Sequence, residues 1–197
     1  MKYRVALAGL GVRGKIHLKG LVENGERFEV VGLCDINEKT MWEAAEQFGL
    51  NVPMFTDAEE MLKATTPDVF AFVTMPEIRT SMVKLAVKYG VKGLSFEKPM
   101  AMNPAECEKM IAAAKKNNVQ LAVGFQYRYH PNTDFLIRTR EKGILGDIMF
   151  VKCQALRRRG IPNWGVFGQK ELQGGGPMID IGVHILETAH YMMGEPK

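Results

Sequence analysis

The sequence of 197 residues lacks any apolar run near the roughly 20 residues that a transmembrane helix needs. Cysteine is scarce: Cys34, Cys107 and Cys153 are widely spaced and form no CxxC pair, which indicates neither a disulfide framework nor a zinc site. The first residues, MKYRVALAGLGVRG, lack a signal-cleavage pattern, and glycines interrupt their apolar stretch. These absences exclude a membrane protein and favour a protein of the reducing cytoplasm.

An excess of charge of one sign is also lacking. The 26 Lys and Arg against 22 Asp and Glu leave a net charge of +4, which is too mild to indicate a nucleic-acid partner. Arg157, Arg158 and Arg159 form the one dense basic run. This run is typical of a solvated strand end or loop, and it fits contact with an anionic or hydroxyl-rich ligand equally well.

Short β-branched and aromatic runs alternate with longer amphipathic runs from Tyr3 to Val123. The strand-like runs are YRVALAGL, FEVVGLCD, VPMF, DVFAFVT, GLSFE and VQLAVGF. Such alternation predicts crossover units and a doubly wound parallel sheet, an α/β fold, over residues 1–123. The nearly continuous apolar character of VALAG and VFAFVT predicts that these strands are covered on both faces.

The pattern changes near Gly124. YRYHPNTDFLIRTREKG predicts a helical region, DIMFVKCQALRRR (147–159) a long strand, and the last glycine-rich stretch a loop leading into a helix. A lone strand exposes unpaired backbone groups and needs neighbours. We therefore expect residues 124–197 to be the incomplete beginning of a second, α+β domain.

Gly9, Gly11 and Gly14 form a G-x-G-x-x-G pattern between the first strand and the first helix. The first glycine suits a tight turn, the second lets backbone approach a pyrophosphate, and the third permits close packing of helix and strand. The helix N-terminus adds N–H groups and a positive dipole. We expect Val12 and Arg13, inside the pattern, to contact the dinucleotide as well.

Asp35 ends the second strand, about 20 residues beyond the last glycine, where an acid can hydrogen-bond the adenosine ribose. This favours NAD as the cofactor. Arg13 and Lys39 can meet a 2′-phosphate, which leaves NADP open. The structural alternative is a glycine-rich turn followed by an aspartate that caps the next helix.

Glu97, Lys98 and Pro99 follow the fifth strand, at the edge where an open α/β sheet binds ligands. Proline keeps Lys98 extended, and a lysine there can orient a substrate oxygen or stabilise developing negative charge. We include Glu97 and Lys98 among the expected cofactor contacts. A loop lysine paired with a surface acid is an equally good interpretation of the spacing.

Asp180 and His184 are four residues apart on the last expected helix and so share a face. They can be a catalytic base and its partner, or a helix cap and a packed histidine. Together with Glu187 and His190 they are also possible metal ligands. His190 lies on another face and no HExxH pattern is present, so we expect no metal.

Three aromatic or basic residues in short loops are candidate substrate contacts: Tyr127, Arg128 and Trp164. Trp164 lies in an NWG segment and can stack on a sugar face.

Three motifs in order, GLGVRG (9–14), FEKP (96–99) and GGGPMIDIGVH (174–184), carry a resemblance over the whole sequence. The chain resembles the glucose-fructose oxidoreductase, inositol dehydrogenase and rhizopine-catabolism (Gfo/Idh/MocA) family. The resemblance implies a Rossmann domain followed by a domain with a large open, mostly antiparallel sheet. It also implies that Gly9, Gly11, Gly14 and Asp35 hold the nicotinamide dinucleotide.

The resemblance further implies a dehydrogenase acting on a secondary hydroxyl of a sugar, cyclitol or glycoside. In that picture His184 takes the hydroxyl proton while Lys98 and Asp180 orient the substrate. Two alternatives stay open: a redox-assisted glycosidase that uses tightly held NAD, and a non-catalytic module that binds a dinucleotide.

Two departures from the family pattern stand out. After the fourth strand the family commonly has T-P-N and then a His, whereas TMPEIRT has Glu77 and Thr80 at the comparable places. Family members also continue well beyond GEPK, so we expect the sequence to be a fragment. The open sheet of the family often forms a subunit interface, which implies a homo-oligomer for the full-length protein.

Overall fold

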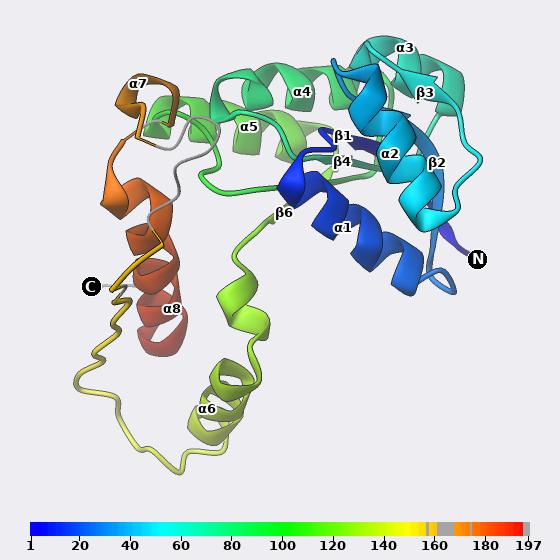
Figure 1. The fold of residues 1–197 in the computed structure, drawn as a ribbon. Coiled ribbons are helices and arrows are strands. Elements are labelled where there is room, and N and C mark those ends of the chain that lie inside the picture. The colour runs from blue at the N-terminus through cyan, green and yellow to red at the C-terminus, as the bar shows by residue number, and fades with distance from the viewer. Residues whose placement is uncertain (157, 161–167, 174, 195–197) are drawn as a thin grey trace. The chain divides into compact units, whose positions relative to one another are not determined.

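The computed structural model describes residues 1–156, 158–160, 168–173 and 175–194 (Figure 1). The chain divides into two compact units, Met1–Val123 and Gly124–Lys197.

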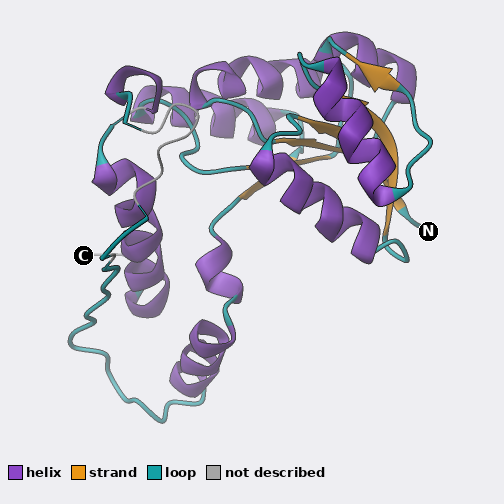
Figure 2. Cartoon of the chain, in the orientation of Figure 1, coloured by secondary structure: helices purple, strands orange, loops and turns teal. Residues whose placement is uncertain are grey.

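The first unit is built on a six-stranded sheet in which every pairing is parallel (Figure 2). The strand order is β3-β2-β1-β4-β5-β6. Because the order reverses between β1 and β4, their carboxyl ends flank the crevice where open α/β sheets bind ligands. The strands are β1 (Tyr3–Ala8), β2 (Phe28–Cys34), β3 (Met54–Phe55), β4 (Val69–Phe72), β5 (Gly93–Phe96) and β6 (Gln120–Val123).

Helices cover both faces of this sheet. The side chains of α1 (Val12–Glu23) and α2 (Glu38–Phe48) enter one apolar cluster, and those of α3 (Ala58–Thr65), α4 (Pro76–Lys88) and α5 (Pro104–Lys116) enter another. Successive residues of a strand point to opposite faces, and β1 shows this directly.

The alternation along β1 sends side chains into both clusters. Val5 and Leu7 enter the cluster of α1 and α2, whereas Ala6 and Ala8 enter that of α3, α4 and α5. All four side chains are nearly inaccessible to solvent. The prediction of a doubly wound parallel sheet with strands covered on both faces is confirmed.

Aromatic packing fixes the two strands that end near the ligand edge. Phe70, Phe72 and Phe96 are fully buried, and the rings of Phe72 on β4 and Phe96 on β5 stack with centroids 4.9 Å apart. Aromatic pairs add to the free energy gained from burial alone. The segments that follow β4 and β5 therefore start from a rigid base.

The second unit is mainly helical where the structure describes it. The predicted helical region contains a 3₁₀ turn, η1 (Gln126–Tyr129), and α6 (Pro131–Glu141). The glycine-rich stretch leads into a π turn, η2 (Met178–Gly182), and α8 (Val183–Met193), with the short α7 (Lys170–Gln173) before them. No helix among the described residues is long and apolar enough to cross a membrane.

The prediction of a long strand over 147–159 is wrong for the residues that the structure describes. Residues 147–156 and 158–159 carry no strand, and Arg157 lies outside the described residues. A strand exists only when a neighbour accepts and donates its backbone hydrogen bonds. No other strand is present in the described part of the second unit, and so none of the antiparallel sheet that the resemblance implies is seen there.

Candidate active site

The turn between β1 and α1 requires glycine at two positions. Gly9 has φ +86°, a left-handed conformation that only glycine adopts without strain, and its N–H donates to the Cys34 carbonyl at 2.8 Å. A Cβ on Gly9 would overlap the Val73 carbonyl, and a Cβ on Gly14 would overlap the Gly9 carbonyl. The pattern thus produces the tight turn and the close helix contact expected of it.

Gly11 differs because the space around it is open. A Cβ there would meet no atom within 4 Å, and Gly11, Val12 and Arg13 are all exposed. Gly11 is also the N-cap of α1 and offers no side chain to its first N–H groups. An uncapped helix N-terminus beneath open space fits an anionic phosphate group.

The Asp35 carboxylate lies beside this turn and accepts two backbone hydrogen bonds. Its Oδ2 accepts from the Leu10 N–H at 2.6 Å and its Oδ1 from the Asn37 N–H at 3.0 Å. A carboxylate has about four acceptor positions, so two remain for ribose hydroxyls. Asp35 therefore braces the glycine turn, a role that the sequence did not indicate.

Lys39, which the sequence offered as a possible partner of the 2′-phosphate of NADP, forms an ion pair with another side chain of α2. Its Nζ lies 4.0 Å from Glu43 in an exposed pair one turn along the helix. Such pairs contribute little free energy, and the pairing does not decide between the two dinucleotides.

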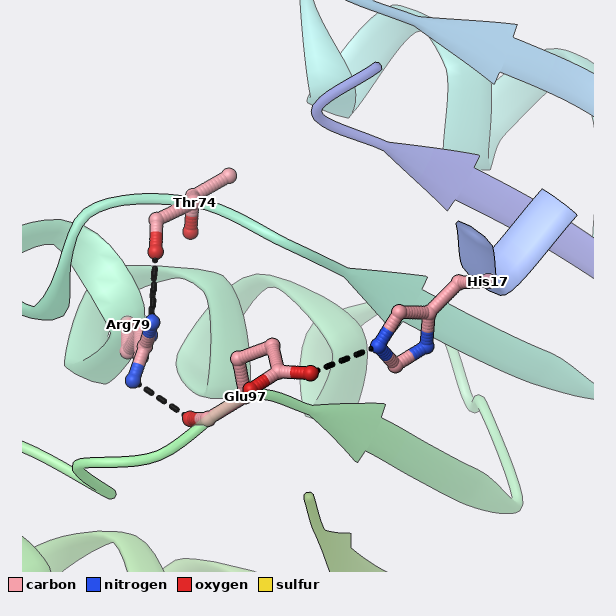
Figure 3. Close-up of polar contacts among 4 residues, drawn as sticks. All are labelled: His17, Thr74, Arg79 and Glu97. Atoms are coloured by element: carbon pink, nitrogen blue, oxygen red, sulfur yellow. Dashed lines mark hydrogen bonds and ion pairs between the residues drawn. The ribbon is translucent and has the colours of Figure 1, made fainter. Parts of the chain in front are cut away.

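Glu97 lies at the carboxyl end of β5, only 9% exposed, and its Oε1 is 2.9 Å from Nε2 of His17 on α1 (Figure 3). Burial raises the pKa of Glu97, but the hydrogen bond with His17 and the charges of Arg13, His17 and Lys98 outweigh it and lower the pKa below 4.5. Glu97 is therefore ionised at neutral pH. Lys98 beside it is half-buried, and the Lys98–Pro99 peptide bond is cis.

Sequence reasoning missed His17 and Arg79. Arg79, on α4, is 4% exposed and donates to backbone carbonyls after β4 and β5. Nothing in one sequence separates these residues from the polar positions of an ordinary amphipathic helix. The segment that departs from the family pattern contains Arg79, whereas Glu77 in the same segment is exposed.

In the second unit Asp180 and His184 lie on either side of a change in helix type. Asp180 belongs to the π turn η2, whereas His184 belongs to α8 and is 4% exposed. The π turn differs from the α-helix that the sequence predicted, because a π turn has i→i+5 hydrogen bonds and more residues per turn. The spacing argument for a shared face therefore does not apply unchanged to this pair.

Aromatic rings surround His184 within its own unit. Its imidazole centroid lies 5.0 Å from that of Tyr127 and 6.0 Å from that of Phe125, the latter edge-on. Tyr127, a predicted substrate contact, is therefore next to the predicted base. Trp164, another predicted contact, lies outside the described residues.

Arg128, the third predicted substrate contact, is engaged with α8. Its Nε pairs with Glu187, and its guanidinium lies over the Tyr191 ring, 4.3 Å from the centroid. Glu187 was one of the four possible metal ligands. Among the residues with described positions, no group of three or more His, Cys, Asp or Glu could hold a metal ion.

Comparison with known proteins decides the family. A family model described as the oxidoreductase family with an NAD-binding Rossmann fold (GFO_IDH_MocA) matches residues 3–125, well over half of the chain. The chain belongs to this family. The GFO/IDH/MocA C-terminal domain matches residues 136–197.

Relatives of this Gfo/Idh/MocA chain include dehydrogenases of known name. It is 37% identical over 194 residues to the D-glucoside 3-dehydrogenase of Escherichia coli (strain K12), covering 98% of this chain and 54% of that protein. It is 22% identical over 196 residues to an inositol 2-dehydrogenase of Salmonella typhimurium, covering 99% of this chain and 56% of that protein. The chain thus spans about half the length of the curated relatives it matches.

Solved structures share its fold. Myo-inositol 2-dehydrogenase from Lactobacillus plantarum superposes with a TM-score of 0.86 at 21% identity, covering 98% of this chain and 57% of that one. Scyllo-inositol dehydrogenase from Lactobacillus casei, solved with NAD(H) and scyllo-inositol, gives 0.84 at 18% identity over 98% and 57% of the two chains. At these identities the likeness concerns the fold alone.

Proposed function

We propose that this chain carries the cofactor site and the catalytic side chains of an NAD-dependent dehydrogenase acting on a secondary hydroxyl of a sugar, cyclitol or glycoside. The observation that carries the proposal is the β1–α1 turn. There the open space at Gly11, the uncapped start of α1 and the Asp35 carboxylate meet at the point where the strand order reverses. The 37% identity to a D-glucoside 3-dehydrogenase supports a glycoside or related sugar as substrate.

The roles of the cofactor-binding residues follow from that turn. The first N–H groups of α1 would bind the pyrophosphate, and the free acceptor positions of Asp35 would bind the adenosine ribose. The carboxylate favours NAD over NADP, because a 2′-phosphate would meet like charge. NAD held there would accept the hydride removed from the carbinol carbon of the substrate.

The roles of the catalytic residues are also part of the proposal. His184 would accept the hydroxyl proton on an imidazole nitrogen, with its ring held by Tyr127 and Phe125. Lys98 and Asp180 would orient the hydroxyl, and Lys98 would stabilise negative charge on its oxygen. We place the dinucleotide site in residues 1–123, the substrate contacts in residues 124–197, and the protein in the cytoplasm as a homo-oligomer.

The test compares two histidines of α8. With NAD and a panel of glycosides, sugars and inositols, we expect the purified protein to produce NADH, His184→Gln to lose at least about 100-fold in kcat, and His190→Gln to stay near wild type. Both variants should bind NADH as the wild type does. Loss of NADH binding together with turnover in His184→Gln would instead assign His184 a structural role.

The same assay separates the alternatives. A redox-assisted glycosidase would release the aglycone without net accumulation of NADH. A non-catalytic module would bind NADH and transform no member of the panel.

A further inference from the structure

Arg79 is a buried cation at the ligand edge of the first unit. It lies in the first turns of α4, is 4% exposed, and points toward the chain segments that follow β4 and β5 (Figure 3). Burial lowers the pKa of Arg79 to about 10, although the nearby charge of Glu97 opposes this shift. Arg79 is therefore still charged at neutral pH.

The guanidinium of Arg79 donates to three backbone carbonyls in two segments. Its Nε and Nη2 donate to the carbonyl of Thr74, two residues after the end of β4, at 3.2 and 2.7 Å. Its Nη1 donates to the carbonyls of Glu97 and Pro99 after β5. The planar fork of arginine suits such a geometry, whereas the point charge of lysine does not.

The free energy of folding alone does not explain this choice of residue. Moving a cation out of water is costly, and this guanidinium donates its hydrogen bonds to neutral carbonyls. Apolar residues of similar volume often replace buried charges without loss of stability. The arginine instead holds two loop segments, the one after β4 and the one after β5, at a fixed distance from each other.

The two carbonyls after β5 belong to the residues immediately before and after Lys98. The Glu97 carbonyl lies in the peptide plane before Lys98, and the Pro99 carbonyl lies in the plane after Pro99. Holding both carbonyls fixes the backbone at the two ends of the Lys98–Pro99 unit and so restricts the direction of the Lys98 Cα–Cβ bond. On the other side Glu97 is bound to His17 of α1, so its side chain is held as well as its carbonyl. The backbone around Lys98 is thus braced from α1 and from α4.

We propose that Arg79 is a positioning residue for Lys98, which it orients by holding the carbonyls of Glu97 and Pro99. This inference rests on the proposed function, in which Lys98 orients the substrate hydroxyl. The segment TMPEIRT therefore keeps a part in the site through Arg79, although it departs from the family pattern.

The test follows the Lys98 amine directly. Reductive ¹³C-methylation labels lysine amines and keeps their charge, and the Lys98 signal is identified by its loss in Lys98→Arg. We compare Arg79→Gln and Arg79→Lys with Arg4→Gln. Arg4 is the matched control because its guanidinium also donates to a backbone carbonyl, that of Thr66, at 2.8 Å.

In both Arg79 variants we expect the Lys98 resonance to move toward those of exposed lysines, and in Arg4→Gln to stay in place. If Arg79→Gln does not fold, Arg79→Lys tests the proposal instead. This variant keeps a positive charge and loses only the planar guanidinium with its several donors. An unchanged Lys98 resonance in a folded Arg79 variant would overturn the proposal.

Turnover provides the second measurement. A misplaced catalytic group can cost about 100-fold in rate, so we expect kcat of Arg79→Lys to fall 10- to 100-fold. Its KM for NAD should change less than its kcat, because the β1–α1 turn, where most of the expected dinucleotide contacts lie, is untouched. A wild-type protein that oxidises no substrate would refute the proposed function, while the Lys98 resonance would still decide the role of Arg79.

Discussion

At the scale of single residues, the carboxylates at the ends of β2 and β5 make hydrogen bonds within the protein, in addition to the ligand contacts proposed for them. Asp35 braces the glycine turn through the Leu10 N–H, and Glu97 accepts from His17. Their place at strand ends was readable in the sequence. Their donors were not, because the His17 and Glu97 side chains meet across 80 positions of chain.

The titration of Glu97 leads to a prediction about acid stability. Because its folded pKa is lowered below 4.5, Glu97 contributes stability that is fully present above about pH 4.5 and is lost as the pH falls through the folded pKa. We expect Glu97→Gln to reduce the free energy of unfolding at pH 7 by about 1–3 kcal/mol. The difference from wild type should shrink as the pH falls below about 4.5.

Urea unfolding at several pH values measures this difference. The exposed Glu26, changed to Gln, is the control and should give a small difference at every pH. A constant gap between wild type and Glu97→Gln from pH 7 to pH 3 would mean that the stability difference does not come from ionised Glu97.

At the scale of elements, the glycines of the β1–α1 turn differ in the space around them. Gly14 permits the close approach of α1 to the turn, whereas Gly11 leaves space open. The sequence pattern predicted both roles, since the geometry of such a turn is local. It could not predict that residues Met178–Gly182 form a π turn, because the same residue types suit an α-helix and a π-helix, which differ in their hydrogen bonding.

The two glycines should respond differently to alanine. Gly14→Ala forces a methyl group into the Gly9 carbonyl and should lower the free energy of unfolding by about 1–3 kcal/mol. Gly11→Ala meets no atom within 4 Å and has φ −61°, so its stability should stay within about 0.5 kcal/mol of wild type. Its affinity for NADH should fall about tenfold or more, because the methyl occupies the proposed phosphate site.

Thermal unfolding and calorimetric titration with NADH test both substitutions on the same samples. Wild-type affinity for NADH in Gly11→Ala would contradict the placement of the pyrophosphate at this turn.

At the scale of the whole molecule, the two units differ in how much core they contain. Among the residues that the structure describes, both large apolar clusters and the six-stranded sheet lie within Met1–Val123. The described part of the second unit is helical, and its segment 147–156 has no strand partner there.

The first unit should therefore fold without the second. We expect residues 1–125, which the Rossmann family model matches almost fully, to unfold in one cooperative urea transition and to bind NADH. Circular dichroism and fluorescence titration are the measurements. A gradual transition, or a folded domain without affinity for NADH, would contradict the proposal that residues 1–123 are an autonomous cofactor domain.

The sequence by itself determined the features that depend on neighbours along the chain: the alternation of strands and helices, the glycine turn and the family motifs. Periodicity, backbone freedom at glycine and helix termini are local properties, so one sequence reveals them. Only the tertiary structure decided that Arg79 is buried against the segments beside Lys98 and that His17 holds Glu97. Those contacts join helices to strand ends far along the chain, and they form only when the whole sheet brings these ends together.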